Sequence, residues 1–166
     1  GKVFSGRYIA GCDPYDDDTA DTMSLGSMFI LDLWTDKIVA EYTGRPLFAD
    51  AFYEKCRLLC LFYNARLNYE SNKKGLFAYF SKMNCLYLLT DVLDYLKDKD
   101  MIKGQLFGNK SKGTTATLPI NNYARTLIRN WLILPKPIIT NDGEKDRETT
   151  VYNLSFIRNR ALLQEL

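Results

Sequence analysis

The chain has 166 residues, of which 46% are hydrophobic and 25% are charged, and its formal net charge is +2. This length fits one domain with a sizeable core, and the near-balanced charge restricts any nucleic-acid site to a local basic patch. The sequence contains no histidine. That absence excludes triads with a histidine base, HExxH metalloproteases and histidine-dependent nucleases, so hydrolytic chemistry would depend on carboxylates, lysine, tyrosine or a metal.

Cysteine spacing and hydropathy indicate the cellular compartment in which the protein would act. Cys12, Cys56, Cys60 and Cys85 show no CxxC spacing, and each lies among apolar residues. We therefore expect buried free thiols in a reducing compartment rather than a zinc site or a disulfide framework. No segment approaches the ~20 apolar residues that span a bilayer, and no signal peptide opens the sequence. These observations predict a cytoplasmic protein without a membrane partner.

The chain is predicted to open with an antiparallel meander. Arg7–Cys12 is a short β-prone run that ends at the turn signal Asp13-Pro14. Ser24–Thr35 and Ile38–Thr43 are predicted as two further strands, joined tightly at Asp36-Lys37.

Helices and strands are predicted to alternate after the meander. Apolar residues recur at three- and four-residue steps over Leu47–Asn64, which predicts an amphipathic helix. The later predicted elements are a strand at Ala65–Tyr69, a helix at Leu76–Met83, a strand at Cys85–Leu89, a helix at Leu118–Leu134 and a final helix at Val151–Leu166, with polar loops at Lys97–Thr115 and Asn141–Arg147. This order predicts a single α/β domain over residues 1–166, in which a meander and then parallel strands form one mixed sheet flanked by helices.

Two carboxylates are predicted at neighbouring strand ends. A strand, a helix and a further strand normally form a parallel crossover, so Asp13 and Glu70 would each follow a carboxyl end at the point where α/β sheets bind ligands. Mg²⁺ or Mn²⁺ would keep both groups ionised, and two such ions about 4 Å apart can cut a phosphodiester without a histidine. The alternative is that Asp13 caps the turn before Pro14 and that Glu70 is merely solvated.

Three segments resemble the nuclease domain of the large terminases of tailed phages. Glu70-Ser71-Asn72-Lys73-Lys74-Gly75 followed by Leu76-Phe77-Ala78-Tyr79-Phe80 resembles the E-x-N-x-x-G-x-G/L pattern of that family. Gly11-Cys12-Asp13-Pro14-Tyr15 is similar to its first catalytic motif, and Tyr123–Leu132 is similar to its late helix, particularly in phages of gut Bacteroidales. The resemblance extends over nearly the whole chain. It implies an RNase H-like fold and a two-metal endonuclease that cuts concatemeric phage DNA during packaging in the host cytoplasm.

The resemblance also implies roles for individual acidic residues. Asp13 and Glu70 would be catalytic ligands of Mg²⁺ or Mn²⁺, and Asp18 or its neighbour Asp17 would add a further contact, unless the acidic run is a solvated turn. The family's third catalytic aspartate follows the final helix, and this sequence ends at Leu166 before any such motif. We therefore expect an incomplete site that binds Mg²⁺ poorly and is better served by Mn²⁺.

Lysines near these motifs are candidates for contact with the DNA backbone. They are Lys73 and Lys74 beside Glu70, and Lys110 and Lys112 in the predicted loop. Phosphate contacts are independent of sequence, which suits a nuclease of low specificity, although such lysines also keep surfaces soluble. The implied partners are double-stranded DNA, the terminase ATPase domain, the portal and the small terminase subunit.

The ATPase motor of a large terminase is not expected in this chain. Glycines at 108 and 113 have the spacing of a phosphate-binding loop, but Thr114 stands where that loop requires lysine. Two other functions remain open. One is another RNase H-like nuclease, such as a Holliday-junction resolvase or an integrase-like enzyme, and the other is a catalytically silent module that binds DNA or the portal.

Overall fold

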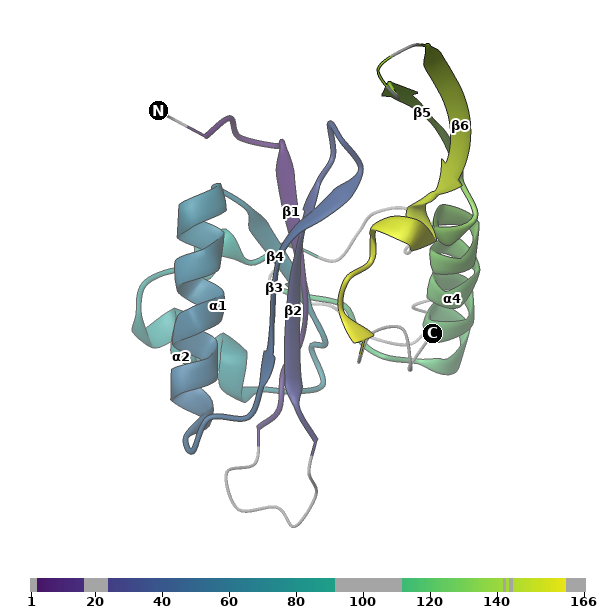
Figure 1. Ribbon diagram of the computed structural model, residues 1–166. Coiled ribbons are helices and arrows are strands. Elements are labelled where there is room, and N and C mark those ends of the chain that lie inside the picture. The colour runs from purple at the N-terminus through teal and green to yellow at the C-terminus, as the bar shows by residue number, and fades with distance from the viewer. Residues whose placement is uncertain (1–2, 17–23, 92–111, 142, 144, 161–166) are drawn as a thin grey trace. The chain divides into compact units, whose positions relative to one another are not determined.

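The computed structural model describes residues 3–16, 24–91, 112–141, 143 and 145–160 (Figure 1). It divides into two compact units, Gly1–Ile120 and Asn121–Leu166. Among the described residues, the first unit contains a mixed sheet packed against helices, and the second contains a β-hairpin. The single domain predicted over residues 1–166 stays a prediction.

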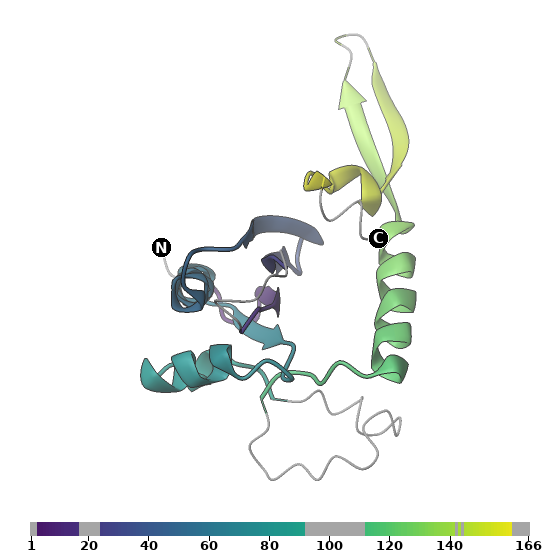
Figure 2. The ribbon, with the colours of Figure 1, turned by 90° about the horizontal axis from the view of Figure 1, so that it is seen from below.

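The sheet of the first unit has four strands in the order β3-β2-β1-β4. β1 (Tyr8–Asp13), β2 (Gly26–Asp32) and β3 (Lys37–Gly44) form an antiparallel meander, whereas β4 (Arg66–Tyr69) runs parallel to β1. Figure 2, seen from below, shows β3 and β4 at opposite edges of this sheet. The mixed α/β sheet, with a meander first and a parallel strand afterwards, is therefore confirmed.

The helices that precede and follow β4 in the sequence cover one face of the sheet, as Figure 1 shows. They are α1 (Ala49–Tyr63) and α2 (Gly75–Lys82), so each predicted boundary moves by only one or two residues. Asn64 ends α1 in the left-handed conformation, with φ of 49°, and its backbone N–H returns to the Cys60 carbonyl oxygen. The chain then turns directly into β4, which places that strand beside β1.

The core lies between the helices and the sheet, with Phe52 of α1 at its centre. The Phe52 side chain is fully buried, and the ring centroids of Tyr15, Tyr42 and Tyr53 lie 5.5, 5.8 and 6.2 Å from its own. Gly26 allows β2 to approach this ring, because a Cβ at that position would lie 2.6 Å from the Phe52 ring carbons. Close packing here joins the meander to α1.

An ion pair connects the segment before β1 to the end of β2. Arg7 Nη2 donates to Asp32 Oδ2 at 2.7 Å, and Arg7 Nε donates to Oδ1 at 3.2 Å. The Trp34 backbone N–H also donates to Asp32 Oδ1 at 3.0 Å, and the Asp32 side chain is only 3% exposed. The Arg7 hydrogen bonds, assisted by the Trp34 amide, lower the pKa of Asp32 to about 2.

Asp32 is expected to stabilise the fold at neutral pH and to lose this effect in acid. Its folded pKa of about 2 lies below the unfolded value, so the stabilisation is present above pH ~4 and disappears as the pH falls toward 2. The difference in Tm between the wild type and Asp32→Asn should be large at pH 7 and should shrink over that acid range. Asp50→Asn, which replaces an exposed carboxylate of α1, is the control. A difference for Asp32→Asn that did not change with pH would contradict the prediction.

The strand predicted at Cys85–Leu89 is wrong. Leu86–Leu88 forms a 3₁₀ turn, which follows Asn84 in a positive-φ conformation, and only Leu89 makes a parallel bridge, to Leu67 of β4. The buried residues are Cys85, Leu88 and Leu89, and their steps of three and four are helical rather than alternating. Short apolar runs are ambiguous between the two patterns, which accounts for the error.

The second unit departs further from the prediction. The helix α4 (Leu118–Leu132) begins as expected and continues into this unit, but it is followed by a hairpin of β5 (Pro135–Asn141) and β6 (Asp146–Tyr152). The predicted loop at Asn141–Arg147 therefore shortens to the residues between these strands. The final helix predicted at Val151–Leu166 is wrong over 151–159, where β6 ends and a 3₁₀ turn, Asn153–Phe156, follows, while 161–166 lie outside the described residues.

Candidate functional site

The structure brings the carboxyl groups of Asp13 and Glu70 together. Cys12 pairs with Tyr69 in the parallel register, and the Glu70 backbone N–H donates to the Cys12 carbonyl oxygen at 3.3 Å. Each acidic residue therefore lies one position beyond this pair, at the carboxyl ends of adjacent strands. The carboxyl group of Asp13 is close enough to act on the pKa of Glu70. The register confirms that they lie at adjacent strand ends, and their role as metal ligands stays a prediction.

The electrostatics of this pair favour retention of a proton. Partial burial raises the pKa of Glu70, and its interaction with the neighbouring Asp13 carboxyl group raises it further. The positive charge of Lys73 and a hydrogen bond from Asn72 oppose that shift only in part. Two ionised carboxylates at this separation repel each other, and a bound divalent cation would offset that repulsion.

The pair lies on the face of the sheet opposite α1. The Cys12 sulfur lies 3.9 Å from the sulfur of Cys56 on α1, and strand alternation directs Gly11 and Asp13 to the other face. A Cβ added at Gly11 would meet no atom within 4 Å, and Asp13 is exposed. Space is therefore available beside the carboxyl groups.

An extended segment around Thr114 supports β4 on its outer side. The Thr114 backbone N–H donates to the Tyr69 carbonyl oxygen at 2.8 Å, and the Ser71 N–H donates to the Thr114 oxygen at 3.0 Å. The Thr114 hydroxyl also donates to Asn68 Oδ1 at 2.9 Å. Gly113 permits this approach, because its φ is 77° and an added Cβ would lie 2.6 Å from the Tyr69 oxygen. Glu70 is thus held between two neighbouring segments.

Sequence reasoning missed the function of Asp16 in the fold. Asp16 Oδ2 accepts a hydrogen bond from the Lys74 backbone N–H at 2.5 Å, and Oδ1 accepts one from Gly75 at 3.0 Å. Asp16 therefore caps the start of α2, where unpaired N–H groups favour a carboxylate. No local signal could reveal this contact, because the two partners are 58 and 59 residues apart. Asp17 and Asp18, the sequence candidates for a further metal contact, lie outside the described residues.

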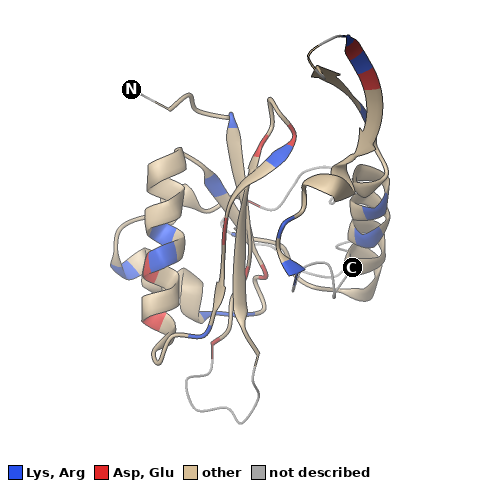
Figure 3. Ribbon diagram, viewed as in Figure 1, with Lys and Arg blue, Asp and Glu red and all other residues tan. Residues whose placement is uncertain are grey.

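The predicted DNA-contacting lysines have different surroundings. Lys73 is close enough to influence Glu70, and Lys74 is exposed. Lys112 Nζ instead contacts Asp91 Oδ1 at 2.6 Å, and Lys110 lies outside the described residues. Figure 3 shows Lys and Arg on α1, on α4 and near strand ends, rather than gathered over one element.

Further metal ligands do not cluster elsewhere among the described residues. In that part of the chain, no group of three or more histidine, cysteine or acidic side chains could hold a metal ion. The cysteines there are free, and three of them are buried, as predicted. Burial and the neighbouring Cys56 raise the pKa of Cys12 well above its ordinary value, so this thiol beside Asp13 stays protonated. To hold a metal ion, Asp13 and Glu70 would therefore need additional oxygen donors.

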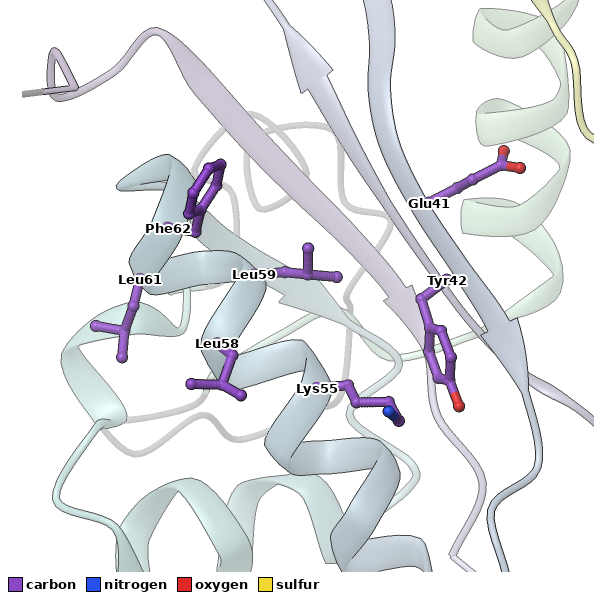
Figure 4. A pocket seen from close by; sticks show the side chains of 7 residues that line it. All are labelled: Glu41, Tyr42, Lys55, Leu58, Leu59, Leu61 and Phe62. Atoms are coloured by element: carbon purple, nitrogen blue, oxygen red, sulfur yellow. The ribbon is translucent and has the colours of Figure 1, made fainter.

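A groove of about 720 Å³ lies between α1 and the edge strand β3 (Figure 4). Its lining residues are Glu41, Tyr42, Lys55, Leu58, Leu59, Leu61 and Phe62. One carboxylate and one ammonium group among apolar side chains do not provide a carboxylate pair for a divalent cation. The acidic pair at the strand ends is the better candidate for chemistry.

Comparisons with known proteins do not assign the chain to a family. No family model, no curated protein and no solved structure matches it. Within the part of the chain that is described, no helix has the length and apolar character needed to cross a membrane.

Proposed function

We propose that this chain is a divalent-metal-dependent DNA endonuclease with an RNase H-like fold, and that it serves as the nuclease domain of a phage large terminase. The observation that carries the proposal is the meeting of Asp13 and Glu70 at adjacent parallel strand ends. The strand order β3-β2-β1-β4, with β2 antiparallel to its neighbours, also supports it. The proposed task is to cut concatemeric DNA during genome packaging.

The donor atoms fit Mg²⁺ or Mn²⁺. Both side chains offer hard carboxylate oxygens, and the raised pKa of Glu70 reflects the partial burial and repulsion that a cation would offset. Asp13 and Glu70 would hold the metal, which when bound would polarise the phosphodiester and activate a water molecule. The open space beside Gly11 leaves room for the substrate backbone at this place.

Residues next to the pair would orient the substrate. Lys73, whose positive charge already acts on Glu70, is placed to attract a backbone phosphate close to the carboxylates. Lys74 is exposed at the start of α2 and adds a second cation at the same turn. Such contacts position DNA without reading its sequence.

Cleavage of supercoiled plasmid by the 166-residue chain tests the proposal. With Mn²⁺ we expect nicked and linear DNA, with slower cleavage in Mg²⁺ because that ion requires near-ideal octahedral geometry. EDTA should stop the reaction. Intact plasmid after incubation with Mn²⁺ would contradict a nuclease, and DNA binding without cleavage would favour the silent DNA-binding module. Cleavage restricted to four-way junctions would favour the resolvase-like alternative.

A further inference from the structure

We propose that Asp16 and Tyr53 are positioning residues that hold the carboxyl groups of Asp13 and Glu70 at a fixed separation. This inference rests on the proposed nuclease function, because it assigns the two residues to the geometry of that site. Neither residue would contact the substrate. They would act through the turns that follow the two acidic residues.

The contacts join those two turns directly. Asp16 lies three residues after Asp13, and its carboxylate accepts hydrogen bonds from the Lys74 and Gly75 backbone N–H groups. Those amides close the turn that begins at Glu70. The turn after β1 and the turn after β4 are therefore bound to each other by one carboxylate.

Tyr53 anchors this junction to the core. Its hydroxyl group lies 2.6 Å from the Tyr15 carbonyl oxygen and 3.0 Å from Asp16 Oδ1, so it can donate to either acceptor. The Tyr53 residue is only 2% exposed. A buried side chain of α1 thus restrains the turn that carries Asp16.

The start of α2 packs against this junction without spare room. A Cβ added at Gly75 would overlap the Tyr53 hydroxyl and would lie 2.8 Å from Asp16 Oδ1. Small displacements of either turn are therefore resisted by contact as well as by hydrogen bonds.

Both carboxylate oxygens of Asp16 already have hydrogen-bond partners within the protein. Oδ1 accepts from Gly75 and is within hydrogen-bond distance of the Tyr53 hydroxyl, while Oδ2 accepts from Lys74. A role as a direct metal ligand would compete with these contacts. The geometry instead gives Asp16 control over the spacing of the two carboxyl groups.

Tyr53→Phe and Tyr79→Phe make a matched test. Tyr79 of α2 donates to Glu54 of α1 at 2.9 Å, so both variants remove a tyrosine–carboxylate hydrogen bond, but only Tyr53 contacts the strand-end turns. Calorimetry should show Mn²⁺ binding about tenfold weaker for Tyr53→Phe, which lies within the range found for residues that orient metal ligands. For Tyr79→Phe, the Mn²⁺ affinity should stay within about twofold of wild type. The Mn²⁺ concentration for half-maximal cleavage should shift in parallel.

Asp16→Ala and Asp16→Asn provide a second test. Asn offers only one side-chain oxygen, so Asp16→Asn can accept from only one of the two amide N–H groups and should restore only part of the Mn²⁺ affinity that Asp16→Ala loses. Equal Mn²⁺ affinity in wild type, Tyr53→Phe and Asp16→Ala would overturn the inference while leaving the nuclease intact. A wild-type chain that neither binds Mn²⁺ nor cleaves plasmid would instead overturn the proposed function itself.

Discussion

Glu70→Gln and Asp13→Asn are each expected to reduce Mn²⁺-dependent plasmid cleavage by more than about 100-fold. Even residues that only orient a metal ligand change affinity or activity by 10–100-fold, so loss of a ligand should exceed that range. Initial rates of plasmid nicking at saturating Mn²⁺ provide the measurement. Glu41→Gln is the matched control, because it neutralises an exposed carboxylate on β3 of the same sheet. Wild-type rates in either site variant would place the chemistry elsewhere.

The same Glu70→Gln variant should fold at least as stably as the wild type. A carboxyl group whose pKa is raised on folding opposes the folded state once it is ionised, at pH values above its unfolded pKa of ~4.3. The metal-free Tm of Glu70→Gln should therefore equal or exceed that of the wild type at pH 7, and the two should converge below pH ~4. A marked fall in Tm at pH 7 would mean that lost cleavage reflects unfolding.

Phe52→Ala is expected to lower the free energy of unfolding by ~3–5 kcal/mol, the range for removal of a large buried aromatic side chain. The ring is fully buried among three tyrosine rings, so the space that it leaves cannot easily be refilled. Gly26→Ala should also destabilise, by ~1–3 kcal/mol, because its Cβ would lie 2.6 Å from the Phe52 ring. Urea denaturation followed by tryptophan fluorescence measures both changes.

Coupling between these positions provides the control. Combining Gly26→Ala with Phe52→Leu should be less destabilising than the sum of the single changes, by ~0.5–3 kcal/mol. Gly11→Ala adds the same methyl group to β1 where no atom lies within 4 Å, and it should be neutral or slightly stabilising. Additive effects at Gly26 and Phe52 would show that the two do not contact each other in solution.

Local pattern determined the first part of the fold. Alternation and turn residues located the meander, and the three- and four-residue period of residues 47–64 located α1. Each of these elements buries one face, so the spacing of its apolar residues in the sequence follows the period of a helix or a strand. The absence of histidine likewise restricted the possible chemistry through composition alone.

Short apolar and polar runs later in the chain were less informative. The Cys85–Leu89 run packs as a turn because Leu88 and Leu89 are buried beside α2 and β4, and its length is too small to establish a period. The β5–β6 hairpin was missed although Ile138, Ile139 and Thr140 are β-branched and precede Asn141 and Gly143, which favour turns.

Only the tertiary structure decided how the candidate site is assembled. The proximity of Asp13 and Glu70 depends on the parallel register between β1 and β4, which sequence order made plausible but did not establish. The contact of Asp16 with the start of α2 joins residues 58 and 59 positions apart, and no periodicity records such a pairing. The physical reason is that capping and carboxylate pairing depend on distances in space, which are set when α1 packs on the sheet and brings the two turns together.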